Sequence, residues 1–166
     1  MKLIRNLEEK AINYIFTISK RPVLYRDLLR ANASFNEGML VDPSILNFRV
    51  DIAKSYFLYT LVCAFFLIPG VYLTHKIFVN IDFHLSIIGT IITTSLVFLG
   101  FQIFQNHLRN LITSQLLQKA WQMHFPHFPY EKYNQKVEKI YGEMVKNEIP
   151  KKEWEKYVID KLVESN

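Results

Sequence analysis

SYFLYTLVCAFFLIPGVYLT, residues 55–74, contains no Asp, Glu, Lys or Arg, and neither does FHLSIIGTIITTSLVFLGFQIFQNHL, residues 83–108. Each stretch holds a core of about 20 mostly apolar residues, which at ~1.5 Å per helical residue is long enough to cross a hydrocarbon layer of ~30 Å. Only Lys76 and Asp82 are charged in the connection between them. The pattern predicts an all-α chain built around a two-pass transmembrane helical hairpin with an amphipathic N-terminal helix and short C-terminal helices.

The hairpin divides the 166 residues into five predicted segments. They are an amphipathic matrix-side or cytoplasmic segment (1–42), a first helix that includes a span (43–77), a connecting loop (78–83), a second transmembrane helix with an extension (84–124) and an amphipathic helical tail (125–166). Asp42–Pro43 predicts the start of the first helix, because an acidic side chain can cap a helix and proline fits its first position. Ala31 to Val41 is expected to be a loop, and no strand-like alternation is found.

Apolar residues at helical spacing predict amphipathic helices in both flanks. The helix expected over residues 3–18 suits the membrane surface or a partner protein, and the pattern resumes over 24–29. The alternative is that these residues pack on the C-terminal helices of the same chain. Phe125–Pro126 ends the second long helix. Two short helices should follow, the first with Tyr133, Val137, Ile140, Tyr141 and Met144 on one face, the second with Trp154, Tyr157, Val158 and Leu162.

The distribution of charge predicts the topology. Residues 1–54 contain nine Lys and Arg, the connection contains Lys76 alone, and the tail after residue 106 contains ten. By the positive-inside rule, both termini should face the mitochondrial matrix or the cytoplasm. Acidic residues are interspersed with the basic ones, so the flanks are mixed-charge surfaces and nucleic acid is not an expected partner.

No pattern in the sequence predicts catalysis, a cofactor or a bound metal. We find no glycine-rich phosphate loop, nucleophile elbow or paired carboxylates, and no acidic or basic residue marks an ion route within the spans. Cys63 is the single cysteine, which excludes an internal disulfide and a thiolate metal site. His124 and His127 have a His-x-x-His spacing but lack a third ligand nearby, and His75 and His84 are poorly placed for haem. We therefore expect a non-enzymatic chain.

A stripe of small and hydroxylated residues in the second span predicts close helix packing. The stripe could face the first span of the same hairpin or another subunit, and it could line the pore of a small homo-oligomeric channel. It consists of Ser86, Gly89, Thr90, Thr93, Thr94 and Gly100.

Residues 24–30, Leu-Tyr-Arg-Asp-Leu-Leu-Arg, are followed by Phe35, and this segment resembles the opening of the LYR-motif proteins. These are small mitochondrial proteins that include accessory subunits and assembly factors of respiratory complexes. The resemblance implies a mitochondrial location, a subunit role and docking of an acylated acyl carrier protein. The implied contact positions are Leu24, Tyr25, Arg26, Arg30 and Phe35. The aromatic residues of the last helix, Trp154 and Tyr157, are further candidates for partner docking.

These features favour a non-catalytic accessory subunit of a large inner-membrane complex, with a mitochondrial respiratory complex or ATP synthase as the expected host. Its expected partners are other membrane subunits and membrane lipids. The alternatives are a bacterial inner-membrane assembly factor or secretion or motor component, and the homo-oligomeric channel. An accessory subunit stays in the mature complex, whereas an assembly factor is lost from it.

Overall fold

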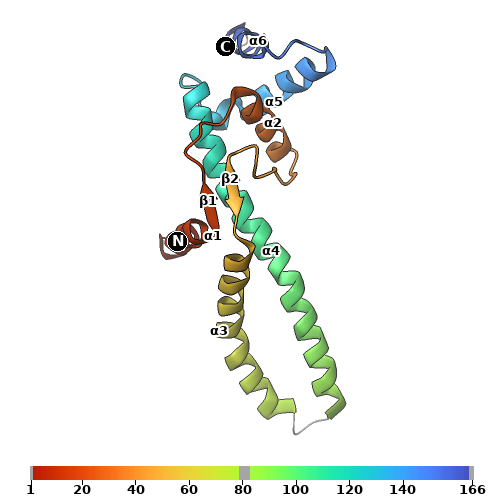
Figure 1. Ribbon diagram of the computed structural model, residues 1–166. Coiled ribbons are helices and arrows are strands. Elements are labelled where there is room, and N and C mark those ends of the chain that lie inside the picture. The colour runs from red at the N-terminus through yellow and green to blue at the C-terminus, as the bar shows by residue number, and fades with distance from the viewer. Residues whose placement is uncertain (1, 79–82, 165–166) are drawn as a thin grey trace. The chain divides into compact units, whose positions relative to one another are not determined.

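The computed structural model describes residues 2–78 and 83–164, which form six helices and two short strands (Figure 1). In chain order they are α1 (Lys2–Ile15), β1 (Phe16–Ile18), α2 (Tyr25–Asn36), β2 (Phe48–Val50), α3 (Ile52–Phe78), α4 (Phe83–His124), α5 (Tyr130–Lys146) and α6 (Trp154–Glu164). The chain is therefore mostly helical, as predicted. Residues 79–82, most of the predicted connecting loop, lie outside the described residues.

Two helices are long and apolar enough to cross a membrane. The qualifying stretches are Ile52–Tyr72 in α3 and Ile87–His124 in α4, and each contains an 18-residue window of high mean hydropathy. Only 6% of the first window and 0% of the second are buried within the chain. Large apolar side chains on both helices are open to the surroundings: Phe65 is 76% exposed and Phe98 is 74% exposed. The apolar character predicted for both stretches is thus matched by helices whose described large apolar side chains are mostly exposed.

The chain forms two compact units, of which the first comprises Met1–Phe16 and Val50–Leu108. It contains α1, α3 and the first part of α4. The helix α1 contacts α3, and the Asp51 backbone N–H donates a 2.9 Å hydrogen bond to the carbonyl oxygen of Ile15. Ile12 and Ile15 are buried. The N-terminal helix therefore packs beside the first turns of α3.

The second unit, Thr17–Arg49 and Arg109–Asn166, has a small core of its own. The helix α2 packs on α5, and α5 packs on α6. The core side chains come from α2, the end of α4, α5 and α6, and include Leu28, Leu29, Trp121, Phe125, Val137, Met144, Val158 and Leu162. For α2, the structure matches the alternative in which the N-terminal flank packs on the C-terminal helices of the same chain.

The predicted start of the first long helix is wrong. Residues 43–47 form turns, Asn47 has a positive φ of 57°, and α3 begins at Ile52. The Asp42 carboxylate accepts hydrogen bonds from the backbone N–H and the hydroxyl of Ser44, at 2.9 and 2.8 Å, which closes a local turn. Asp51 caps α3 instead, because its Oδ1 atom accepts a 3.1 Å hydrogen bond from the Lys54 backbone N–H.

Two further boundaries differ from the predictions, and two short strands were not predicted. The first helix ends at Ile15 rather than at residue 18, because β1 follows at once and pairs with β2. These three-residue strands are too short to produce a recognisable alternation of apolar and polar residues. The expected loop from Ala31 to Val41 is also wrong in part, since α2 continues to Asn36. The polar residues Asn32 and Asn36 of α2 donate hydrogen bonds to α5, so they are compatible with a helix.

Candidate interaction surfaces

An aromatic cluster joins α3 to α4 within the first unit. The Tyr56 and Phe101 rings are stacked with centroids 4.1 Å apart, and the Tyr59 ring meets Phe101 edge-on at 5.3 Å. The Tyr59 hydroxyl donates a 2.6 Å hydrogen bond to the carbonyl oxygen of Val97. Offset and edge-on aromatic pairs and a hydrogen bond shielded from water are the contacts that hold helices together in an apolar medium.

Gly100 makes the Tyr59 contact possible. A Cβ atom at position 100 would lie 2.5 Å from the Tyr59 hydroxyl oxygen and 3.6 Å from its Cζ. Any larger residue would therefore displace the hydroxyl from Val97. Gly100 is thus a predicted packing residue that this structure places directly against α3.

Gly89 and Thr93 lie in a part of the stripe for which no contact with α3 is described. The Thr93 hydroxyl donates to the Gly89 carbonyl oxygen one turn earlier, at 2.8 Å, which satisfies it within its own helix. No described atom lies within 4 Å of the Cβ position of Gly89. Thr94 is exposed. The side chains of Ser86 and Thr90 lie outside the described residues. Among the described residues, none therefore packs against α4 at Gly89.

In the second unit, the residues of the LYR resemblance are divided between surface and interior. Leu24, Arg26 and Arg30 are exposed, whereas Tyr25 and Phe35 are half-buried. The Tyr25 ring packs against His124 and Phe125, with centroids 5.5 and 5.4 Å away. Its buried hydroxyl has no hydrogen-bond partner among the described residues. Burial, and to a lesser extent the charge of Glu155, raises the pKa of Tyr25 above its usual value.

The predicted docking residues of α6 also lie in different surroundings. Trp154 is buried, its ring meets Tyr141 edge-on at 5.7 Å, and its indole N–H donates to the Ile149 carbonyl oxygen at 2.9 Å. Its surface is therefore used inside the second unit. Tyr157 is half-buried, with the Lys161 ammonium 6.0 Å from its ring centroid.

Sequence reasoning missed the polar contacts that join α2 to α5. Asn32 is fully buried, and its side-chain amide donates to the Asn134 carbonyl oxygen at 2.8 Å. Asn36 donates to a Glu138 carboxylate oxygen at 2.9 Å. The spacing of Leu28, Asn32 and Asn36 along one helical face could have indicated that these residues share an interface.

The second unit also contains a hollow of about 170 Å³, lined by apolar and basic residues. The basic residues are Lys20, Arg21 and Lys119. Its other lining residues are Ile18, Ser19, Pro22, Val23, Leu46, Leu116, Ala120 and Met123.

Among the side chains that the structure describes, which exclude those of residues 73–86, no three His, Cys, Asp or Glu residues converge as a metal site would require. The His124 Nε2 atom donates to the Val23 carbonyl oxygen at 2.8 Å, so one nitrogen of the predicted His-x-x-His pair has a structural role.

Comparison with known proteins gives no match: no protein-family model fits the sequence, and neither a curated protein nor a solved structure is significantly similar to it. The resemblance to LYR-motif proteins stays a prediction that rests on residues 24–35.

Proposed function

We propose that this chain is a two-pass membrane protein that serves as a non-catalytic accessory subunit of a large inner-membrane complex. The observation that carries the proposal is the exposure of α3 and α4: 6% and 0% of their apolar windows are buried. The core helix of a water-soluble protein would be mostly buried. Leaving one large apolar side chain in water costs ~1.5–3 kcal/mol. The many exposed apolar side chains of α3 and α4 therefore require lipid or protein around them.

A hairpin is supported by where α3 and α4 touch. Tyr56 and Tyr59 lie near the beginning of α3, and they contact Val97 and Phe101, which lie beyond the middle of the apolar part of α4. Such pairing is expected of helices that run in opposite directions. The excess of Lys and Arg in both flanks then favours both termini on the matrix or cytoplasmic side.

A subunit role is supported by surfaces that the chain leaves uncovered. The open helix surface around Gly89 and Thr93 would accommodate a neighbouring transmembrane helix. Phe65 and Phe98 would contact lipid or another subunit. The second unit, with its own core, would present mixed-charge helices to subunits outside the membrane. We propose a mitochondrial respiratory complex or ATP synthase as the host, on the LYR resemblance.

The test is extraction of native membranes in a mild detergent, followed by native electrophoresis and mass spectrometry of the band that contains the chain. A constitutive subunit should migrate with a large assembly and be present in the purified mature complex. If the chain is found only with assembly intermediates, it is an assembly factor instead. If it migrates as a free monomer or a small homo-oligomer, the proposal is wrong.

A further inference from the structure

The N-terminal helix α1 has an apolar face that α3 covers only in part. Ile12 and Ile15 are buried. On the neighbouring part of the helix circumference, Ile4 is 62% exposed, Leu7 is 58% exposed and Tyr14 is 45% exposed. Their spacing of three and seven residues, with Ala11 between Leu7 and Tyr14, places them in one stripe. We call Ile4, Leu7, Ala11 and Tyr14 the open face of α1.

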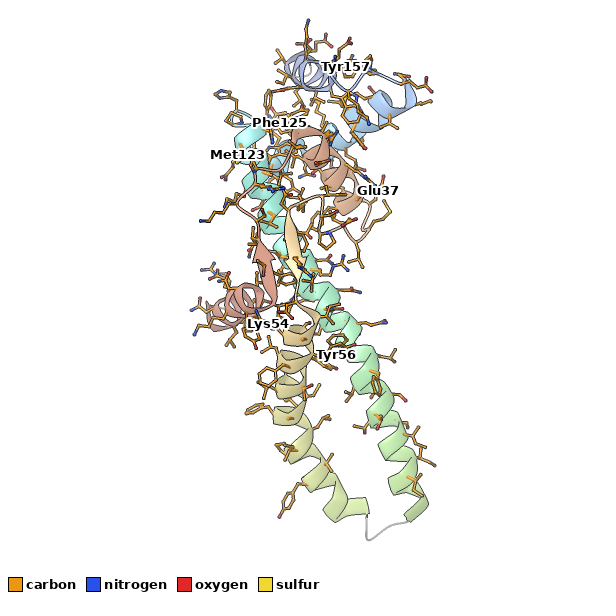
Figure 2. The ribbon with its side chains drawn as sticks, viewed as in Figure 1. Glu37, Lys54, Tyr56, Met123, Phe125 and Tyr157 are labelled. Carbon is orange, nitrogen blue, oxygen red and sulfur yellow. The ribbon has the colours of Figure 1, made fainter. Side chains whose placement is uncertain are left out.

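Three contacts fix the level of α1 along α3 and α4. The Ile15 carbonyl oxygen accepts from the Asp51 backbone N–H at 2.9 Å, and the Lys54 ammonium lies 5.5 Å from the centroid of the Tyr14 ring. A Glu8 carboxylate oxygen lies 3.2 Å from His107 Nε2. Figure 2 shows Lys54 beside α1 at the start of α3.

These partners mark the ends of the two uncharged stretches. Asp51 and Lys54 precede residue 55, where the first uncharged stretch begins, and His107 stands next to Leu108, where the second one finishes. If α3 and α4 span a bilayer, this is the level of its headgroups. The helix α1 is thus held where the chain passes from water into hydrocarbon.

We infer that α1 is an interfacial helix whose open face lies in the surface of the bilayer, an inference that rests on the membrane anchoring proposed above. An amphipathic helix at the headgroup level lowers its free energy by placing its apolar face against the acyl boundary. Tyr14 is suited to this level because its ring is apolar and its hydroxyl is polar. The opposite side of α1 is exposed and polar, with Arg5, Asn6, Glu9, Lys10 and Asn13, and would face water.

The occupant of the open face is lipid, and its attraction is mainly apolar. Over residues 2–15 the sequence has three basic and two acidic residues, so little net charge is available to select anionic headgroups. A bilayer of phosphatidylcholine should therefore suffice. At the start of α3, in the same unit, Ile52, Tyr56 and Phe57 are exposed as well, and they are expected to contact lipid at a similar depth.

The test uses the full chain in phosphatidylcholine nanodiscs, with a nitroxide spin label at one position at a time. Cys63→Ala removes the native thiol. Leu7→Cys places the label on the open face, and Asn13→Cys is the matched control on the polar side of the same helix. Phe65→Cys reports on the first span. Power saturation then compares collisions with oxygen, which enters lipid, and with a water-soluble nickel chelate.

We expect the oxygen-to-nickel accessibility ratio to be several-fold higher at position 7 than at position 13. Equal ratios at these positions would overturn the inference. So would a label at position 7 that is shielded from both reagents, because protein and not lipid would then cover the open face. The label at position 65 separates the two proposals: if it collides mainly with oxygen, the chain is anchored and only the inference about α1 has failed. If it collides mainly with the nickel chelate, the membrane anchoring itself is wrong.

Discussion

The contact between Gly100 and Tyr59 allows a double-mutant test of how α3 and α4 pack. Gly100→Ala places a Cβ atom 2.5 Å from the Tyr59 hydroxyl oxygen. The hydroxyl is at the end of a side chain that can move, so it should give way and lose its 2.6 Å hydrogen bond to Val97. Tyr59→Phe removes the same oxygen, and the nearest remaining ring atom, Cζ, is 3.6 Å from the new Cβ.

The size of the effect follows from this geometry. A hydrogen bond between membrane helices contributes about 0.6 kcal/mol on average and about 1.7 kcal/mol at most. Tyr59→Phe should therefore cost about that much. Gly100→Ala should lose the same bond, partly offset by the higher helix propensity of alanine. In the Tyr59→Phe background that bond is already absent, so Gly100→Ala should be neutral or stabilising. The two substitutions should thus be non-additive by about 0.6 kcal/mol or more.

The assay is reversible unfolding of the full chain in mixed micelles, with the free energy of unfolding measured for the parent, both single variants and the double variant. Gly89→Ala is the matched control, because no described atom lies within 4 Å of its Cβ position and it should not couple to Tyr59→Phe. Additive costs for Gly100→Ala and Tyr59→Phe would refute the described packing of α3 on α4.

Three further outcomes are expected in the second unit. Tyr25→Phe should leave the free energy of unfolding unchanged or raise it, because the buried hydroxyl has no hydrogen-bond partner among the described residues. A decrease in the free energy of unfolding of more than about 1 kcal/mol would reveal a hydrogen bond that this structure does not contain. Asn32→Ala should lower the free energy of unfolding by about 0.5–1.5 kcal/mol, since it removes the hydrogen bond that this fully buried side chain donates to the Asn134 carbonyl oxygen. Asn36→Ala, at a half-buried position, should cost less, and equal costs would contradict the assigned interface. Hydrogen bonds from the backbone N–H of Ser44 and, to a lesser extent, from its hydroxyl lower the pKa of Asp42. The ionised carboxylate therefore stabilises the folded chain above the usual pKa of ~3.9, and this stabilisation is lost as the pH falls through the lower pKa of the folded state. Thermal unfolding between pH 5 and pH 2 should accordingly be less acid-sensitive in Asp42→Asn than in the parent, and an unchanged acid sensitivity would exclude this role.

Much of the helical architecture could be predicted because it depends on long-period patterns. The apolar stretches around Phe65 and Phe98 and the stop at Phe125–Pro126 correspond to α3, α4 and the end of α4. The amphipathic spacing of Val137 and Val158 likewise identified the inward faces of α5 and α6. Such signals sum over many residues and tolerate local exceptions.

Short-range chemistry was less informative. An Asp followed by Pro suits a tight turn as well as a helix start, and only the hydrogen bonds distinguish Asp42, which closes a turn, from Asp51, which caps α3. Similarly, the composition of Asn32 and its neighbours suggests a loop, but Asn134 on α5 supplies the partner that makes a buried asparagine acceptable in a helix. The indole N–H of Trp154, a predicted docking residue, bonds to the Ile149 carbonyl oxygen, which the local sequence did not indicate. Each difference depends on a residue far away or on backbone geometry that the local sequence does not specify.

The central claim is that the uncharged stretches 55–74 and 83–108 cross a lipid bilayer. Its most direct test is an alkaline carbonate wash of membranes from cells that express the full chain, with a peripheral protein and a known multi-span protein as references. The account predicts that the chain remains in the membrane pellet with the multi-span protein. Release into the supernatant with the peripheral protein would contradict it.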